Sequence, residues 1–322
     1  MTSLESAGIN KRASWLELFY DLVFVAIIAQ FTYAVADQVF TIESLIITVV
    51  VGYMIFTAWW GTTVSRNLQD SETTKDRLYV QVLMIFALLL SILMPDIFKE
   101  GDVSRFFLAY ALVRLIQLFM LLRLYRLKPE EAPVTYNIAQ AFAISIGLFV
   151  AASFLSLPYA LILAVAGLVL ELFGPLTTGK GNKTRFLNVS HLQERLGLFL
   201  LLIMGESVLV VALANTAVAV TIERPLVIFA GVLNMIALWW LYFSHLEKEA
   251  EGVRPKNLIL YLNAHALLFG SIVLLASAYK NILKHGYEYV ASDAILLSVG
   301  SFLVIATLII IRHTIFGFML KK

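Results

Sequence analysis

The sequence predicts an all-α polytopic integral membrane protein with about ten transmembrane helices. Three observations support this fold class. The 322-residue chain is 60% hydrophobic and only 14% charged, with a mean hydropathy of +0.86, whereas soluble domains are about 45–50% apolar. Apolar runs follow one another with short polar breaks, and many reach the roughly 20 residues that a bilayer-spanning helix needs. Lys and Arg also gather in every second break.

Ten apolar spans are expected along the chain. The fifth and sixth are separated only near Ser156, where Pro158 indicates a tight turn. Merging them would give a helix too long for a bilayer, so we count two. In chain order the spans are 15–37, 42–64, 78–94, 105–125, 133–155, 157–176, 196–216, 225–245, 258–280 and 289–318.

Positive side chains predict the orientation, because short cytoplasmic loops retain Lys and Arg. With ten spans, one side holds most of the cations, and the other holds Lys99, Arg224, Lys284 and, at a span edge, Arg105. Both chain ends are therefore expected in the cytoplasm, with residues 1–14 as a cytoplasmic N-terminus and 15–322 as a single transmembrane domain. The cytoplasmic set is Lys11, Arg12, Arg66, Lys75, Arg77, Arg126, Lys128, Lys180, Lys183, Arg185, Lys248, Arg254, Lys256, Lys321 and Lys322.

A weak internal match relates spans one to four to spans seven to ten. FYDLVFVAIIAQ around Asp21 aligns with MGESVLVVALAN around Glu206, and Trp59-Trp60 aligns with Trp239-Trp240 at an offset of 180. We infer a parallel repeat of 15–128 and 191–322, as in transporters built by duplication. Residues 129–190 would then hold two intervening helices and a cytoplasmic loop.

Several ionisable side chains fall inside the spans, where a charge costs about 2.5–3.5 kcal/mol on insertion scales. Glu17 and Asp21 are four residues apart, within about 40° on one helical face. Arg195 and Glu206, eleven apart, also share a face. The acids outnumber the arginines, so some are protonated or a cation is present. The candidate ion, proton or substrate path comprises Asp21, Glu206, Glu17, Glu194, Arg195, Arg114 and His265.

Other interpretations stay open for these residues. The acids could pair with arginines only to hold helices together, and a lone His265 is more often a hydrogen-bonded helix contact than a ligand. His191 and Glu194 have the spacing of a metal site on a helix but lack further ligands, so no metal is assigned. No catalytic motif appears, no catalytic residue is named, and the sequence implies no cofactor. The absence of cysteine excludes disulfides and cysteine nucleophiles.

Two motifs resemble those of the bacterial low temperature requirement A family: ELFYDLVFV at 17–25 and HLQERLGLFLLLIMGESVL at 191–209. Tyr20 stands where the family pattern has Phe. The resemblance covers essentially the whole chain and implies a multi-pass protein of the bacterial inner membrane, linked by name to growth in the cold. It implies no known reaction. The matching residues are Glu17, Phe19, Asp21, His191, Glu194, Arg195, Gly205 and Glu206.

We expect a transporter or channel for a cation, a proton or a proton-coupled small solute. Asp21 and Glu206 would be equivalent acids near a central path, with Glu17, Glu194 and Arg195 as its cytoplasmic vestibule. An anionic substrate held by arginines stays open. The alternatives are a membrane-embedded enzyme that modifies lipid, and a sensor or assembly protein for cold growth. The expected partners are the lipid bilayer and a small ion or solute; nucleic acid is not expected, and a homo-oligomer stays open.

Overall fold

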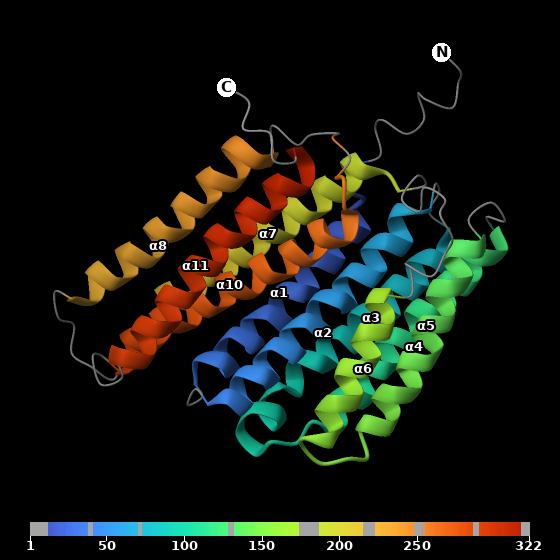
Figure 1. The fold of residues 1–322 in the computed structure, drawn as a ribbon, viewed down its shortest axis with the longest axis horizontal. Coiled ribbons are helices and arrows are strands. Elements are labelled where there is room, and N and C mark those ends of the chain that lie inside the picture. Colours follow the sequence, from blue (N-terminus) through green and yellow to red (C-terminus); the bar gives the residue numbers. More distant parts are fainter. Residues whose placement is uncertain are drawn as a thin grey trace. The chain divides into compact units, whose positions relative to one another are not determined.

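The computed structural model describes residues 12–37, 41–69, 73–127, 132–173, 187–214, 223–247, 253, 255–285 and 290–316. Within these ranges the chain forms ten α-helices and no strand (Figure 1). Nine of these described helices are long and apolar enough to cross a membrane, while α6 (Tyr159–Phe173) has 15 residues. The all-α polytopic prediction is confirmed.

The remaining helices follow the predicted spans, with differences at some ends. The fifth and sixth spans are separate helices, as expected. The seventh helix begins at Val189 rather than 196, because its first two turns carry the polar residues of the HLQER motif, which lower the local hydropathy. The bounds are α1 Trp15–Ala36, α2 Ile42–Asn67, α3 Thr74–Ile92, α4 Ser104–Leu127, α5 Ala132–Ala152, α7 Val189–Ala212, α8 Glu223–Leu241, α10 Leu258–His285 and α11 Val290–Phe316, with π-helical turns η1 Asp96–Glu100 and η4 Tyr242–Glu247.

Local hydrogen bonds fix where several helices begin and end. The Thr41 hydroxyl accepts from the Ser44 N–H, and the Ser44 side chain accepts from the Thr41 N–H, which forms a capping box at the start of α2. Thr73 and Asp76 form the same arrangement before α3. The π-helical turn η1 ends at Gly101, whose φ of 71° favours glycine. These caps satisfy backbone N–H groups at the helix starts that have no partner within the helix.

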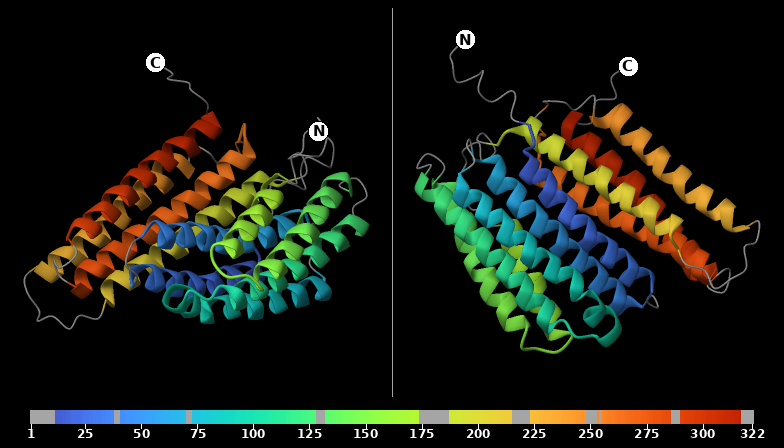
Figure 2. Two further views of the ribbon diagram at one scale, coloured as in Figure 1. Left: turned by 60° about the horizontal axis from the view of Figure 1, so that its bottom comes forward. Right: turned by 180° about the vertical axis from the view of Figure 1, so that it is seen from behind.

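The helices divide into two compact units. Unit 1 comprises residues 1–27 and 41–188, and unit 2 comprises 28–40 and 189–322, so α1 contributes its first part to unit 1 and its last turns to unit 2. In unit 1, α4 packs against α2, α3 and α5, and α6 packs against α5 and α2. Figure 2 shows these helices from two further directions. This division does not test the internal repeat, which stays a prediction.

In unit 2, α10 packs against α7, α8 and α11. Part of the core is a buried cluster of Val211, Ala214, Tyr279 and Leu283, from α7, the residues that follow it, and α10. At the end of α1, the Lys280 and Lys284 ammonium groups both donate to Asp37 Oδ1, over 3.2 and 3.0 Å. Lys280 Nζ also lies 3.9 Å from the centroid of the Tyr33 ring. This cation cluster ties α10 to α1.

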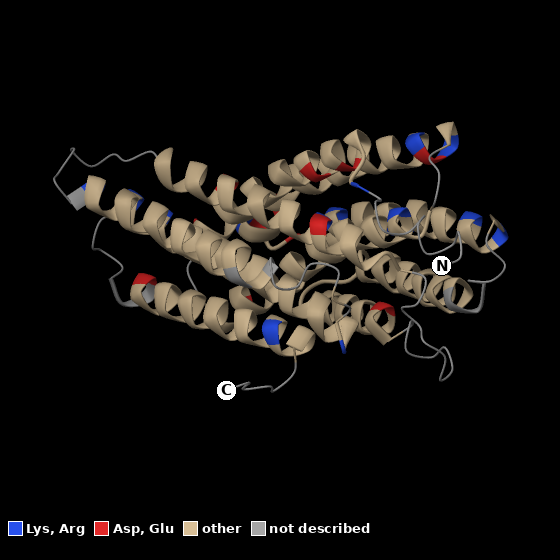
Figure 3. Cartoon of the chain, turned by 90° about the horizontal axis from the view of Figure 1, so that it is seen from above, with Lys and Arg blue, Asp and Glu red and all other residues tan. Residues whose placement is uncertain are grey.

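Long stretches of helix carry no charged residue (Figure 3). Many large apolar side chains on the helix surfaces are exposed, as expected for helices that face lipid. Most of residues 1–14 lie outside the described residues, as do the expected cytoplasmic cations Lys11, Lys128, Lys180, Lys183, Arg185, Lys248, Arg254, Lys321 and Lys322.

Candidate functional site

Glu17 caps helix α1 and also faces a buried arginine. The Ser14 N–H donates to Glu17 Oε2 over 2.8 Å, and the Glu17 N–H donates to Ser14 Oγ over 3.3 Å. The other carboxylate oxygen, Oε1, lies 4.0 Å from Arg66 Nε, and both side chains are buried. Ser14 and Glu17 have the Ser-x-x-Glu spacing of a capping box, so this role of Glu17 is visible in the sequence.

Asp21 lies one turn further along α1 and is fully buried. Its Oδ1 accepts a hydrogen bond of 2.7 Å from the indole Nε1 of Trp59 on α2. The donor is neutral, so this contact itself brings no second charge to the acid. Trp59 therefore contacts an intramembrane acid, a role that its place in the predicted repeat does not indicate.

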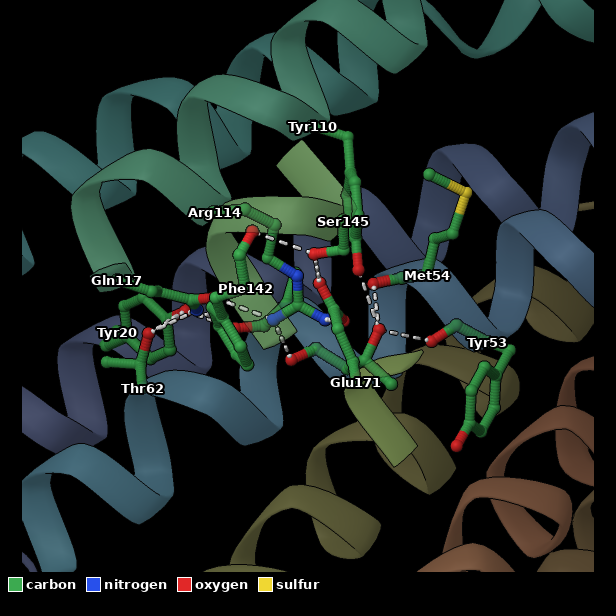
Figure 4. A network of polar contacts seen from close by, with 12 residues as sticks. Tyr20, Tyr53, Met54, Thr62, Tyr110, Arg114, Gln117, Phe142, Ser145 and Glu171 are labelled. Carbon is green, nitrogen blue, oxygen red and sulfur yellow. Dashed lines mark hydrogen bonds and ion pairs between the residues drawn. The ribbon is translucent and has the colours of Figure 1, made fainter. Parts of the chain in front are cut away.

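Arg114 on α4 is the centre of a buried polar network in unit 1 (Figure 4). Its Nη2 donates to Glu171 Oε2 on α6 over 2.5 Å. Ser145 Oγ on α5 donates to the other Glu171 oxygen over 2.7 Å. Arg114 Nη1 donates to the Thr57 carbonyl oxygen over 2.9 Å and to Gln117 Oε1 over 2.7 Å. Four helices are thus linked through one guanidinium group.

Gln117 extends the network to α1. Its Nε2 donates to the Ala58 carbonyl oxygen over 2.6 Å and to Thr62 Oγ1 over 3.0 Å. The Tyr20 hydroxyl, next to Asp21 in the chain, donates to the same Thr62 oxygen over 2.9 Å. On α2, Ala58 of the network directly precedes Trp59, the partner of Asp21. The Asp21–Trp59 contact and the Arg114 network therefore occupy neighbouring positions on both α1 and α2.

Close packing surrounds the guanidinium group. Its Cζ lies 4.9 Å from the ring centroids of both Tyr110 and Phe142, within the range of cation–π attraction. A Cβ atom at Gly61 on α2 would lie 2.8 Å from Gln117 Oε1 and 3.0 Å from Arg114 Nη1. Glycine at this position therefore lets the backbone of α2 approach the network.

In unit 2, His265 makes hydrogen bonds through both ring nitrogens. Its Nε2 lies 2.9 Å from the Tyr242 hydroxyl and its Nδ1 lies 2.8 Å from the Tyr261 carbonyl oxygen. The ring is fully buried. These contacts are those of a hydrogen-bonded helix contact, the alternative to a ligand role for this histidine.

The ionisable residues of α7 differ in how deeply they are buried. His191 and Arg195 are buried, whereas Glu194 and Glu206 are half-buried. The Glu206 side chain makes no hydrogen bond or ion pair with any residue that the structure describes. Helical rise places it about 18 Å beyond Glu194 along the axis. A single site built from both acids is therefore incompatible with this helix.

The second Trp pair also differs from the first. Trp59 is fully buried and bonded to Asp21, but the matching Trp239 on α8 is 41% exposed and makes no described hydrogen bond to Glu206. If the two halves arose by duplication, this acid–indole contact is a feature of the first half.

The structure distributes the seven predicted site residues over both units. Glu17, Asp21 and Arg114 lie in unit 1, and Glu194, Arg195, Glu206 and His265 lie in unit 2. A path shared by Asp21 and Glu206 stays a prediction. In the part of the chain that the structure describes, no three His, Cys, Asp or Glu side chains lie close enough to hold a metal ion.

Comparisons with known proteins give one family and one relative. The family model described as Bacterial low temperature requirement A protein (LtrA) matches residues 12–321. An uncharacterized protein of Rhizobium meliloti (strain 1021) is 28% identical over 295 residues, which are 86% of this chain and 71% of the relative. No solved structure matches the chain.

Proposed function

Because this chain belongs to the bacterial low temperature requirement A family and is a multi-pass membrane protein, we propose that it transports an ion or a small solute. The transported species is a cation, a proton or a solute that moves together with a proton. The intramembrane carboxylates Asp21 and Glu206 are the proposed sites of proton or cation binding.

The observation that carries this proposal is the environment of Glu206. Glu171 has Arg114 as its partner, and Glu17 caps α1 and faces Arg66. Glu206 instead lies within an apolar helix with no described hydrogen-bonding partner. An acid in that position is costly and is usually functional. Binding a proton or a cation would offset its cost.

Asp21 suits the same role for a different reason. Its carboxyl group is fully buried and is held by a neutral indole N–H. An indole donor can hydrogen-bond both the charged and the protonated form of the acid. Asp21 can therefore change charge while its position is kept. We further propose that Glu17, Glu194 and Arg195 serve as the cytoplasmic vestibule of the path, and that Arg114 and His265 are also residues of the path.

We also propose that the protein resides in the bacterial inner membrane with both termini in the cytoplasm. The support is the segregation of Lys and Arg in the sequence. A fluorescent protein that folds only in the cytoplasm, fused to either end, should be bright. A fusion after residue 101, in the predicted opposite-side loop between α3 and α4, should be dark. A dark fusion at either terminus would refute this orientation.

Flux measurements with the purified full-length protein in liposomes test the transport proposal. Imposed proton, sodium and potassium gradients should each be followed, with a pH-sensitive dye or an ion-selective dye inside the vesicles. Wild-type protein should raise the rate of at least one flux, and Asp21→Asn and Glu206→Gln should each abolish most of that increase.

The matched control is Glu100→Gln, which removes an exposed acid outside the apolar core of the helices. It should keep wild-type flux. All variants must show the same monodisperse elution in detergent, so that lost flux reflects the acid and not the fold. Wild-type flux in both Asp21→Asn and Glu206→Gln would refute the assignment of these acids.

Neither alternative gains comparable support. A lipid-modifying enzyme that uses His191, Glu194 and Glu206 together is disfavoured by the length of α7 that separates the last residue from the other two. A sensor or assembly role would leave the charges as scaffolding. Under that role, Glu194→Gln combined with Arg195→Gln should keep function in a cold-growth assay while each single change loses it.

A further inference from the structure

Arg114 has one donor that the network leaves unused. The side chain is 1% exposed, and its Nε–H is buried with no acceptor among the described residues. Nη1 already has two acceptors and Nη2 has Glu171. A buried donor on a charged group without an acceptor is unfavourable, so this atom calls for a specific explanation.

The unused donor lies on the edge of the guanidinium group that best recognises a carboxylate. Nε and Nη2 point in the same direction, and their spacing matches the two oxygens of a carboxylate. Glu171 uses this edge only in part. Its Oε2 accepts from Nη2, while its Oε1 accepts from Ser145. A carboxylate is thus already present beside the edge, but it does not bind both donors.

We propose that the Nε–Nη2 edge of Arg114 is the binding site for the carboxylate of a transported organic acid, and that Glu171 occupies part of this site when no solute is bound. This inference rests on the proposed function and names its substrate class. The room for the ligand group is the volume that the Glu171 carboxylate now fills. Tyr110 and Phe142 pack against the guanidinium group, with each ring centroid 4.9 Å from its Cζ.

Exchange of the two carboxylates requires a proton. One guanidinium group cannot neutralise both a bound carboxylate and an ionised Glu171, and two like charges in one buried site are unfavourable. Glu171 therefore takes a proton on Oε2, its ion pair with Nη2 breaks, and the solute accepts from Nε and Nη2. The protonated Glu171 carboxyl group leaves this volume, and Ser145 keeps only its other acceptor, the Phe142 carbonyl oxygen at 3.0 Å. One proton enters the site with each anion, so the site carries no net change in charge.

The groups that face Glu171 fit this exchange. Arg114 and Tyr110 come from α4, and Ser145 comes from α5. Tyr53 on α2 also lies within electrostatic reach of Glu171. Among these groups only Arg114 carries a charge at neutral pH. The charge that favours the ionised form of Glu171 therefore comes from Arg114.

Ligand-induced stabilisation of the detergent-purified full-length protein tests the inference. Acetate is the probe, and acetamide, which has the same shape without the charge, is the control ligand. Acetate should raise the Tm of the wild type more than acetamide does, because a ligand that binds the folded state stabilises it. The effect should grow as the pH is lowered from 8 to 6. In Glu171→Gln, which lacks the competing charge, acetate should bind several-fold more tightly and with little dependence on pH.

Arg114→Lys should lose the difference between acetate and acetamide, because an ammonium group lacks the paired donors of a guanidinium edge. The matched control is Arg123→Lys, at the end of α4, where the arginine pairs with Asp76. It should keep the wild-type response. If Glu171→Gln does not fold, the pH series of the wild type and the response of Arg114→Lys still test whether acetate binds at Arg114.

Equal shifts with acetate and acetamide in the wild type, at every pH, would overturn the inference and return the Arg114–Glu171 pair to a structural role. An unchanged acetate response in Arg114→Lys would do the same. Both measurements report binding and not flux. Loss of flux in Glu206→Gln without any acetate effect would therefore contradict this inference alone, whereas an acetate effect without any flux would contradict the transport proposal alone.

Discussion

Trp59 holds Asp21 in place: the indole N–H on α2 donates to the carboxyl oxygen on α1 over 2.7 Å, with both side chains at 0% exposure. The contact gives an acid inside an apolar helix a neutral hydrogen-bond donor. It also places Asp21 next to Tyr20, whose hydroxyl belongs to the Arg114 network. One turn of α1 therefore supplies both a protonatable acid and a contact with the polar centre of unit 1.

Trp59→Phe should lower the free energy of unfolding by about 1–3 kcal/mol, because Asp21 loses a donor in a buried site. Thermal or denaturant unfolding in detergent measures this loss. Trp60→Phe is the control, since Trp60 is half-buried and makes only ring contacts with its neighbours. Equal losses in the two variants would show that ring volume, and not the hydrogen bond to Asp21, accounts for the effect.

Most of the fold could be predicted because it depends on the length and hydropathy of single segments. Helix α2 begins at Ile42 and α10 begins at Leu258, as the apolar runs indicate. The prediction is less accurate at α7, where the polar residues from His191 to Arg195 are helical. Hydropathy identifies helix segments that face lipid. These polar residues are largely buried within the protein, so hydropathy does not detect this part of the helix.

The candidate site could be predicted only in part. Charged residues in apolar runs identify Asp21, Arg114 and Glu206 without any structure. Their partners are less visible. Gln117 is an ordinary polar residue one turn beyond Arg114 on α4, and Glu171 and Ser145 join the network only through the packing of α4, α5 and α6. The sequence supplies the charges, but the helix packing decides which of them are neutralised.

The cap at the start of α1 predicts different effects for two changes at one residue. Glu17→Gln keeps an acceptor for the Ser14 N–H, because Gln also serves in a capping box. Glu17→Ala removes it. We therefore expect Glu17→Ala to cost about 1 kcal/mol more than Glu17→Gln in unfolding experiments. Ser14→Ala should cost a similar amount, because it removes the reciprocal acceptor.

Equal losses in Glu17→Gln and Glu17→Ala would instead point to the ion pair between Glu17 and Arg66. If Glu17→Gln is as destabilising as Glu17→Ala, the charge beside Arg66 matters more than the cap. Arg66→Gln should then be rescued in part by the Glu17→Gln change, which a double-mutant cycle would detect.

Gly61 predicts an effect of added volume next to Arg114. A methyl group there would press against Gln117 Oε1 and Arg114 Nη1, so Gly61→Ala should cost about 1–3 kcal/mol in spite of the better helix propensity of alanine. The control is Gly147→Ala on α5, where a Cβ atom would meet nothing within 4 Å. That change should be neutral or stabilising by up to about 1 kcal/mol. Matching losses of Tm at both positions would contradict the close approach of α2 to the network.

The cluster at the end of α1 predicts how stability depends on pH. Burial alone would raise the pKa of Asp37, but the hydrogen bonds and charges of Lys284 and Lys280 outweigh it and hold this pKa below its ordinary value. A lowered carboxyl pKa contributes stability above the unfolded-state value of about 3.9 and loses it as the pH falls through the folded value. Asp37→Asn should therefore have a lower Tm than the wild type at pH 7, and the difference should shrink below about pH 4.

Asp96→Asn is the control, because its partner Arg105 is largely exposed and the pair should contribute little. A difference between Asp37→Asn and wild type that stays constant down to pH 3 would show that the carboxylate charge does not stabilise this cluster.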